Sequence, residues 1–174
     1  MRRSPELTLA LIVALAIVSC GKGSSVKPVA SGTSSEAVAR VDLLEAGIRA
    51  VAKPSRVLLV QTRLCPDIPV VQEDCPAAMT HQETAILAER LVDLSKDVRF
   101  VPTFEATYGT VPDKVSRDYI MLDVPQDRGD GTYWIEAGEV SCEMCAHGGT
   151  YVLELRDGTW VSTGNAPGTG QWVA

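Results

Sequence analysis

The sequence predicts an α+β domain in which an antiparallel β-meander of three to five strands packs against two helices. Two separate stretches have apolar residues at every third or fourth position, and each follows a residue pair with capping-box spacing. The last third of the chain alternates apolar and polar residues around Asp-Gly pairs, which are typical of tight hairpins.

The first helix is predicted over residues 36–52. Thr33 and Glu36 have capping-box spacing, and Pro54 ends the apolar pattern. This helix could pack on the domain or extend a stalk. A second helix follows the capping pair Thr80 and Glu83 and continues to about Ser95.

Strands are predicted on both sides of the second helix. Short β-branched runs indicate buried strands at 57–60 and 98–101. The last third of the chain contains four further candidates, at residues 119–124, 133–140, 150–156 and 159–161. Asp130-Gly131 and Asp157-Gly158 are predicted turns. The Gly-rich tail after Gly164 is expected to be loose.

The chain begins with the three-part plan of an export signal. Arg2 and Arg3 give a positive start, an apolar run follows from Leu7 to Val18, and Cys20 comes next to small residues. A membrane-spanning helix needs about 20 apolar residues, and this run is shorter. We therefore expect residues 1–19 to be a cleaved signal peptide.

Residues Ile17-Val18-Ser19-Cys20 resemble the lipobox of bacterial lipoproteins. The resemblance implies cleavage before Cys20 by signal peptidase II and a thioether-linked diacylglycerol on Cys20. The alternative is an ordinary signal peptide, which would leave the mature protein free of the membrane. The lipoprotein interpretation predicts an exported cell-envelope protein anchored by its lipid, with residues 20–35 as a flexible Gly- and Ser-rich tether and 36–174 as one domain.

The charge balance restricts the partners. Removal of residues 1–19 takes away Arg2, Arg3 and Glu6, so the formal net charge changes from −6 to −7. The chain contains no basic run, and an acidic surface repels nucleic-acid backbones. We therefore exclude nucleic acid and expect the membrane, through the lipid, and a protein or small molecule as partners.

Four cysteines remain beyond Cys20, and an exported chain meets oxidising conditions in which thiols pair. The favoured disulfides are Cys65–Cys75 and Cys142–Cys145, because each pair is close along the chain. Cross-pairing, with two long-range bridges, stays an alternative because sequence alone cannot choose between connectivities.

The spacing Cys142-x-x-Cys145 is also found in redox dithiols. A reactive thiolate needs a helix N-terminus, whereas here a Gly-rich step and a strand follow, and no βαβ unit is recognised before the motif. A structural disulfide is therefore favoured and no cofactor is expected. The alternative is thiol-redox chemistry or a metal site. The available metal ligands would be Cys142, Cys145 and His147, completed by Cys65, Cys75 or His81.

The remaining motifs have simpler explanations. The segment 127–131 fails the ligand pattern of a calcium loop, and Arg128-Gly129-Asp130 is interpreted as a polar turn rather than an adhesion motif. His81 and His147 are expected to be solvated polar residues. No nucleophile elbow, phosphate loop or zinc-protease motif is found, so no catalytic residue is assigned. The clustered aromatic residues are expected in the core rather than in a ligand groove: Tyr119, Tyr133, Trp134, Tyr151, Trp160 and Trp172.

Two functional classes remain. The first is a lipid-anchored envelope protein with a non-catalytic binding or interaction domain. The second is a thiol-redox or metal-binding protein centred on Cys142 and Cys145. The last third of the chain contains, in order, Cys-x-x-Cys, Gly-Gly, a strand, Asp-Gly and Trp. This order is similar to that in small exported bacterial domains of unknown function, and the resemblance implies no activity.

Overall fold

The computed structural model describes residues 34–65, 75, 77–103, 117–142 and 145–173. The predicted signal peptide, Cys20 and the tether up to residue 33 lie outside this part of the chain. Within the described residues no helix has the length and apolar character needed to cross a membrane.

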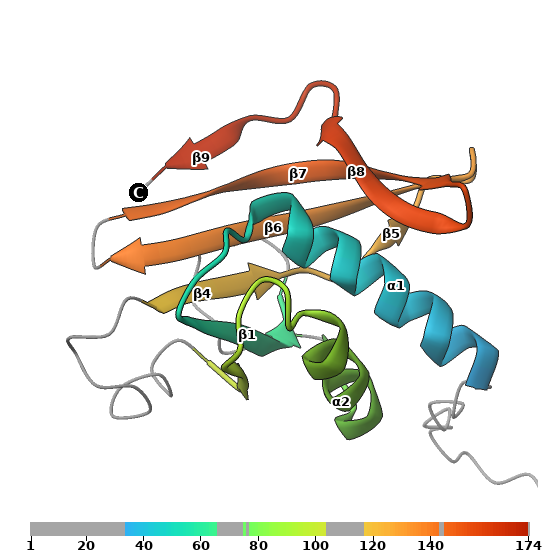
Figure 1. Cartoon of the computed structure of the whole chain (residues 1–174). Helices are drawn as coiled ribbons and strands as arrows, with labels where there is room; N and C mark the ends of the chain where they lie inside the picture. The colour runs from blue at the N-terminus through green and yellow to red at the C-terminus, as the bar shows by residue number, and fades with distance from the viewer. Residues whose placement is uncertain (1–33, 66–74, 76, 104–116, 143–144, 174) are drawn as a thin grey trace, which may run out of the picture. The chain divides into compact units, whose positions relative to one another are not determined.

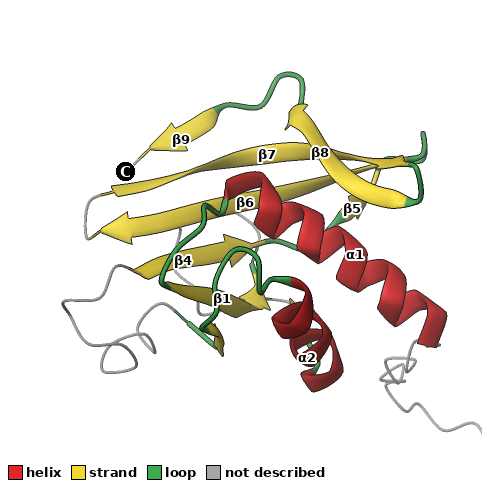
Figure 2. Ribbon diagram, in the orientation of Figure 1, coloured by secondary structure: helices red, strands yellow, loops and turns green. Residues whose placement is uncertain are grey.

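The described residues form one mixed sheet of nine strands with two helices on it (Figures 1 and 2). The helices are α1 (Ser34–Val51) and α2 (His81–Arg90). The strands are β1 (Val57–Leu64), β2 (Ala77–Ala78), β3 (Val98–Val101), β4 (Arg117–Leu122), β5 (Gln126–Asp127), β6 (Thr132–Cys142), β7 (Cys145–Arg156), β8 (Thr159–Asn165) and β9 (Gln171–Val173). Their order is β2-β1-β4-β6-β7-β8, with β3 paired to β1, β5 to β6 and β9 to β7.

The α+β class is confirmed, but three to five strands is too few, and the sheet is not a purely antiparallel meander. Strand β1 runs parallel to β3 and to β4, whereas β4, β6, β7 and β8 follow one another antiparallel. Helix α2 lies between β1 and β3 in the chain, and parallel strands require such a crossover. The expectation that no βαβ unit precedes Cys142 was therefore wrong, because isolated β-branched runs do not reveal their pairing partners.

Helix α1 packs on the sheet rather than extending a stalk. It contacts β4, β6, β7 and β8, and both helices lie on the same side of the sheet in Figure 2. Its residues Val41, Leu44 and Ile48 are fully buried. A Cβ at Gly47 would lie 2.6 Å from Ile135 Cδ1, so the helix approaches β6 closely at this residue.

Helix α2 begins with the predicted capping box. The Thr80 hydroxyl accepts a hydrogen bond from Glu83 N at 3.2 Å, and the Glu83 carboxylate accepts one from Thr80 N at 2.6 Å. The helix ends at Arg90 instead of continuing to Ser95. The amides of Leu94 and Ser95 both bond to the carbonyl of Leu91, which closes a turn there.

The sheet is apolar on both faces near β1 and β4. Leu58 and Val60 of β1 face the helices, and Val57 and Leu59 alternate onto the opposite face. This opposite-face cluster consists of Val57, Leu59, Val101, Tyr119 and Met121, with Val140 and Trp172 packed against it. The continuous apolar run predicted as a buried strand is therefore explained by burial on both faces.

The tail after Gly164 is ordered, which corrects the expectation of a loose end. Strand β8 continues to Asn165, and β9 pairs antiparallel with residues 147–149 of β7 (Figure 1). The Trp172 indole lies against Gly138 and Gly148, and its Nε1 donates a hydrogen bond to Glu136 Oε1 at 3.2 Å. Gly138 of β6 and Gly148 of β7 have no side chains, so they leave room for the Trp172 ring. The packing of this ring anchors the tail.

The expectation that the aromatic residues lie in the core is met fully only by Tyr119, because the other five are partly exposed. Tyr119 is 1% exposed, and its hydroxyl donates a hydrogen bond to Gln61 Oε1 at 2.6 Å. Tyr133, Tyr151 and Trp160 pack partly buried against the helix-side core. Trp134 is partly exposed, with the Arg128 guanidinium 4.2 Å from its ring centroid.

Candidate functional site

The favoured disulfide between Cys65 and Cys75 is present. Cys65 follows β1 and is 5% exposed, and its Cα lies 4.4 Å from that of Cys75. The amide of Gln61 donates a hydrogen bond to Cys65 Sγ at 3.0 Å. The bridge thus joins the buried end of β1 to the segment before β2, and neither sulfur is available as a metal ligand.

Cys145 is also disulfide-bonded. It begins β7 and stands opposite Cys142, the last residue of β6, in the strand register. The pairing of Cys142 with Cys145 stays a prediction, since the Cys142 side chain lies outside the described residues. Cys145 leads into a strand and not a helix, so the dipole that lowers a redox thiol's pKa is missing here. The described residues include no group of three or more His, Cys, Asp or Glu that could hold a metal.

The two histidines differ in environment. His81 is the exposed first residue of α2, as expected for a solvated side chain. His147 lies opposite Glu139 on β6, with its Nε2 3.3 Å from Glu139 Oε2. Its side chain is 42% exposed, so solvent reaches the ring, and the neighbouring Glu139 carboxylate is a partner that the sequence did not predict.

A buried pair of carboxyl groups lies beside His147. Glu139 is 2% exposed and Asp118, on β4, is 9% exposed. Lys53, just after α1, places its Nζ 3.9 Å from Glu139 Oε2. Burial raises the pKa of Glu139, and repulsion from Asp118 raises it further, while Lys53 and His147 act in the opposite direction. The net result is a pKa of Glu139 above its ordinary value.

This pair should make stability depend on pH. The folded state holds the Glu139 proton more tightly than the unfolded state, so its stabilising effect is complete below the ordinary pKa of 4.5 and is lost as pH rises through the raised value. We expect Glu139→Gln to be more stable than the parent at neutral pH and to lack this decline, as measured by urea unfolding across the pH range. Glu89→Gln, at an exposed position of α2, is the control. A Glu139→Gln variant that keeps the parent's pH slope would contradict the assignment.

A cleft of about 400 Å³ lies between the two helices and the β7–β8 turn. One side of the cleft is charged and consists of Asp42, Glu45 and Arg49 of α1 and Arg90 of α2. The other side consists of residues 158–161, which include Trp160. Asp157 and Gly158 have φ of 52° and 78°, which confirms the predicted tight hairpin. This hairpin sets Trp160 across from the helices.

The charged residues of the cleft bind one another. Arg90 Nη1 lies 3.1 Å from Glu45 Oε2 and also pairs with Asp42. Arg49 donates from Nε to Glu45 at 2.9 Å and through both Nη atoms to Asp93. These contacts raise the pKa of both arginines and lower that of Asp93. The network therefore stays ionised and holds the two helices together.

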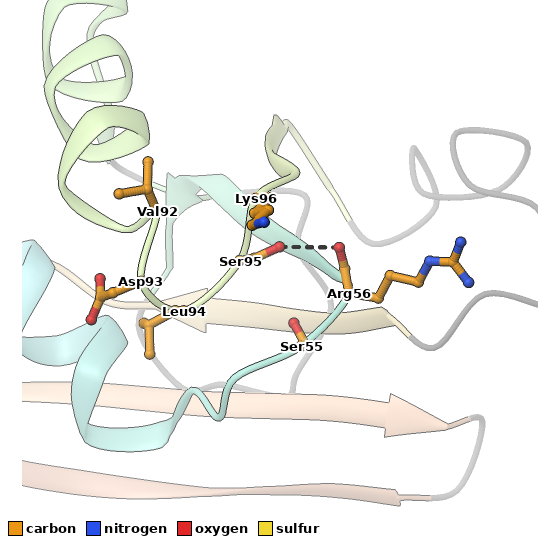
Figure 3. Close-up of a pocket in the computed structure, with 7 residues that line it drawn as sticks. All are labelled: Ser55, Arg56, Val92, Asp93, Leu94, Ser95 and Lys96. Atoms are coloured by element: carbon orange, nitrogen blue, oxygen red, sulfur yellow. Dashed lines mark hydrogen bonds between the residues drawn. The ribbon is translucent and has the colours of Figure 1, made fainter.

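A second hollow of about 360 Å³ lies between the segment after α1 and the segment after α2 (Figure 3). The hydroxyl groups of its residues Ser55 and Ser95 already donate hydrogen bonds to backbone carbonyls. Ser95 Oγ donates to Arg56 O, and Ser55 Oγ donates to Val57 O. The Arg56 side chain extends away from the other labelled residues in Figure 3. The polar groups do not converge, so the first cleft is the stronger candidate site.

Sequence reasoning missed this cleft, and it also missed the buried carboxyl pair. Glu139 lies two and four residues after the buried Ala137 and Ile135, and such residues point to the same face of a strand. This spacing is a signal in the sequence for a charged side chain that faces the core. The cleft had no such signal, because its walls come from segments far apart in the chain. No family model, curated protein or solved structure is significantly similar to the chain.

Proposed function

We propose that this protein is an exported bacterial lipoprotein of the cell envelope, whose domain binds a ligand without catalysing a reaction. The anchoring half of the proposal rests on Ile17-Val18-Ser19-Cys20 at the end of the apolar run. The Cys65–Cys75 disulfide is compatible with an oxidising compartment, where exported chains form such bonds.

The binding half rests on the cleft between α1, α2 and the β7–β8 turn. Its volume of about 400 Å³ lies in the range of small-molecule sites. Its charged side chains are neutralised by one another, so they offer hydrogen bonds rather than a strong acid, base or nucleophile. Preformed polar walls beside an aromatic ring support recognition rather than chemistry.

The anchor is tested by fractionating cells that produce the full chain or its Cys20→Ser variant. Two or more acyl chains hold a protein firmly at a membrane, so we expect the parent in the membrane fraction, released by detergent but not by high salt. Cys20→Ser should lose this detergent-dependent anchoring and should not incorporate a labelled fatty acid. Ser19→Ala keeps a small residue before the cysteine and serves as the matched control. Equal fatty-acid labelling of the parent and Cys20→Ser would overturn the proposal.

A further inference from the structure

The side chains that line the cleft between the two helices and the β7–β8 turn carry two negative and two positive charges, and Asp93 beside the cleft adds a third carboxylate, which binds Arg49. Two carboxylates, Asp42 and Glu45, face two guanidinium groups, Arg49 and Arg90. An anion entering the cleft would be repelled by the carboxylates, and a cation by the guanidinium groups. A neutral molecule with many hydrogen-bonding groups meets neither penalty.

The network still has hydrogen-bonding capacity at the cleft. A guanidinium has five N–H donors, and the contacts of Arg90 with Asp42 and Glu45 use only its Nη1. Asp42 contributes one oxygen, Oδ1, to the same contact, and a carboxylate has two oxygens that accept. The side chains of Arg90 and Asp42 are 37% and 35% exposed, so water or a ligand can reach both. A donor and an acceptor therefore lie side by side.

Trp160 supplies an apolar wall next to these polar groups. Its ring meets Tyr133 edge to face with centroids 5.2 Å apart, which fixes its orientation. The face of an indole is negatively polarised and attracts weakly positive C–H groups. Aliphatic C–H faces combined with several hydroxyl groups on one ring are characteristic of a sugar.

We propose that this cleft binds one or two neutral sugar rings of a glycan. A pair of neighbouring hydroxyls would accept from Arg90 and donate to Asp42, and the C–H face of the ring would lie on Trp160. Because the ion pairs stay intact, binding breaks none of the contacts that hold α1 to α2. This inference rests on the binding half of the proposed function and names its ligand class.

The test is a titration of the purified protein with neutral disaccharides (cellobiose, chitobiose, maltose and lactose), followed by ¹H–¹⁵N NMR. We expect saturable shifts of the Trp160 indole N–H and of the Arg90 Nε–H. Trp160→Ala should weaken the affinity by about tenfold. Trp134→Ala removes a tryptophan outside the cleft and should leave the affinity unchanged.

Two further experiments distinguish a loss of binding from a loss of folding, and a sugar from other classes of ligand. Arg90→Lys keeps the positive charge and loses the planar donors, so it should weaken binding even if Trp160→Ala fails to fold. A dipeptide and an uncharged nucleoside test the competing ligand classes. The inference is overturned if no disaccharide shifts these signals, if the variants bind as well as the parent, or if only the dipeptide or the nucleoside binds. Membrane anchoring through Cys20 is measured separately, so failure here leaves that result untouched.

Discussion

Replacing Leu44 with alanine is expected to lower the free energy of unfolding by about 2–5 kcal/mol. Leu44 is fully buried between α1 and the sheet, in the same cluster as Ile120, Ile135 and Leu153. The alanine variant loses the transfer free energy of the removed methyl groups and leaves a cavity that a helix across four strands cannot readily close. Urea unfolding followed by tryptophan fluorescence measures the difference.

Val92→Ala is the control for this experiment. Val92 is 60% exposed after α2, so its truncation should change stability by less than about 0.5 kcal/mol. An equally small effect of Leu44→Ala would mean that α1 is not part of the folding unit and forms a separate stalk.

Gly148→Ala is expected to lower the free energy of unfolding by about 1–3 kcal/mol. A Cβ at Gly148 would lie 2.5 Å from the carbonyl oxygen of Ala137 and would overlap the Trp172 ring. The backbone of β6 cannot move aside freely, so the contact with Ala137 strains the pairing of β6 with β7. The Trp172 indole must also move away from the new Cβ, which loosens β9. Unfolding measurements and the NMR shift of the Trp172 indole N–H report these two effects.

Gly149→Ala is a matched control at the adjacent residue of the same strand. A Cβ there would meet its nearest neighbour, the carbonyl oxygen of Gly170, at 3.5 Å, which is ordinary contact. This substitution should be near neutral or stabilising by up to about 1 kcal/mol, since alanine restricts the unfolded chain. If the two variants are equally stable, Trp172 does not pack on Gly148 as described.

Local patterns predicted most of the elements. The Thr80–Glu83 capping box, the strand 98–101 and the Asp157-Gly158 hairpin depend on residues within a few positions of one another, and the structure has all three. The parallel pairing of β1 with β3 and β4 depends on contacts between distant segments, which periodicity does not encode. The β9 strand was missed for a similar reason, because the Gly-rich tail is ordered by contacts with β6 and β7, which are distant in the sequence.

The candidate site was less predictable than the fold. Cysteine spacing predicted the Cys65–Cys75 bridge because both residues are near in sequence. The cleft combines Asp42, Arg90 and Trp160, which are brought together only by the packing of α1 and α2 beside the β7–β8 turn. Each of these residues, taken alone, looks like an ordinary surface or core residue in the sequence. No sequence motif therefore predicts that they lie together.

Lipid anchoring is tested most directly by the intact mass of the protein purified from membranes, with fragmentation of its N-terminal peptide. We expect residues 1–19 to be absent and Cys20 to be the first residue, carrying the added mass of a diacylglycerol. A protein that retains Met1, or whose Cys20 is unmodified, would contradict it.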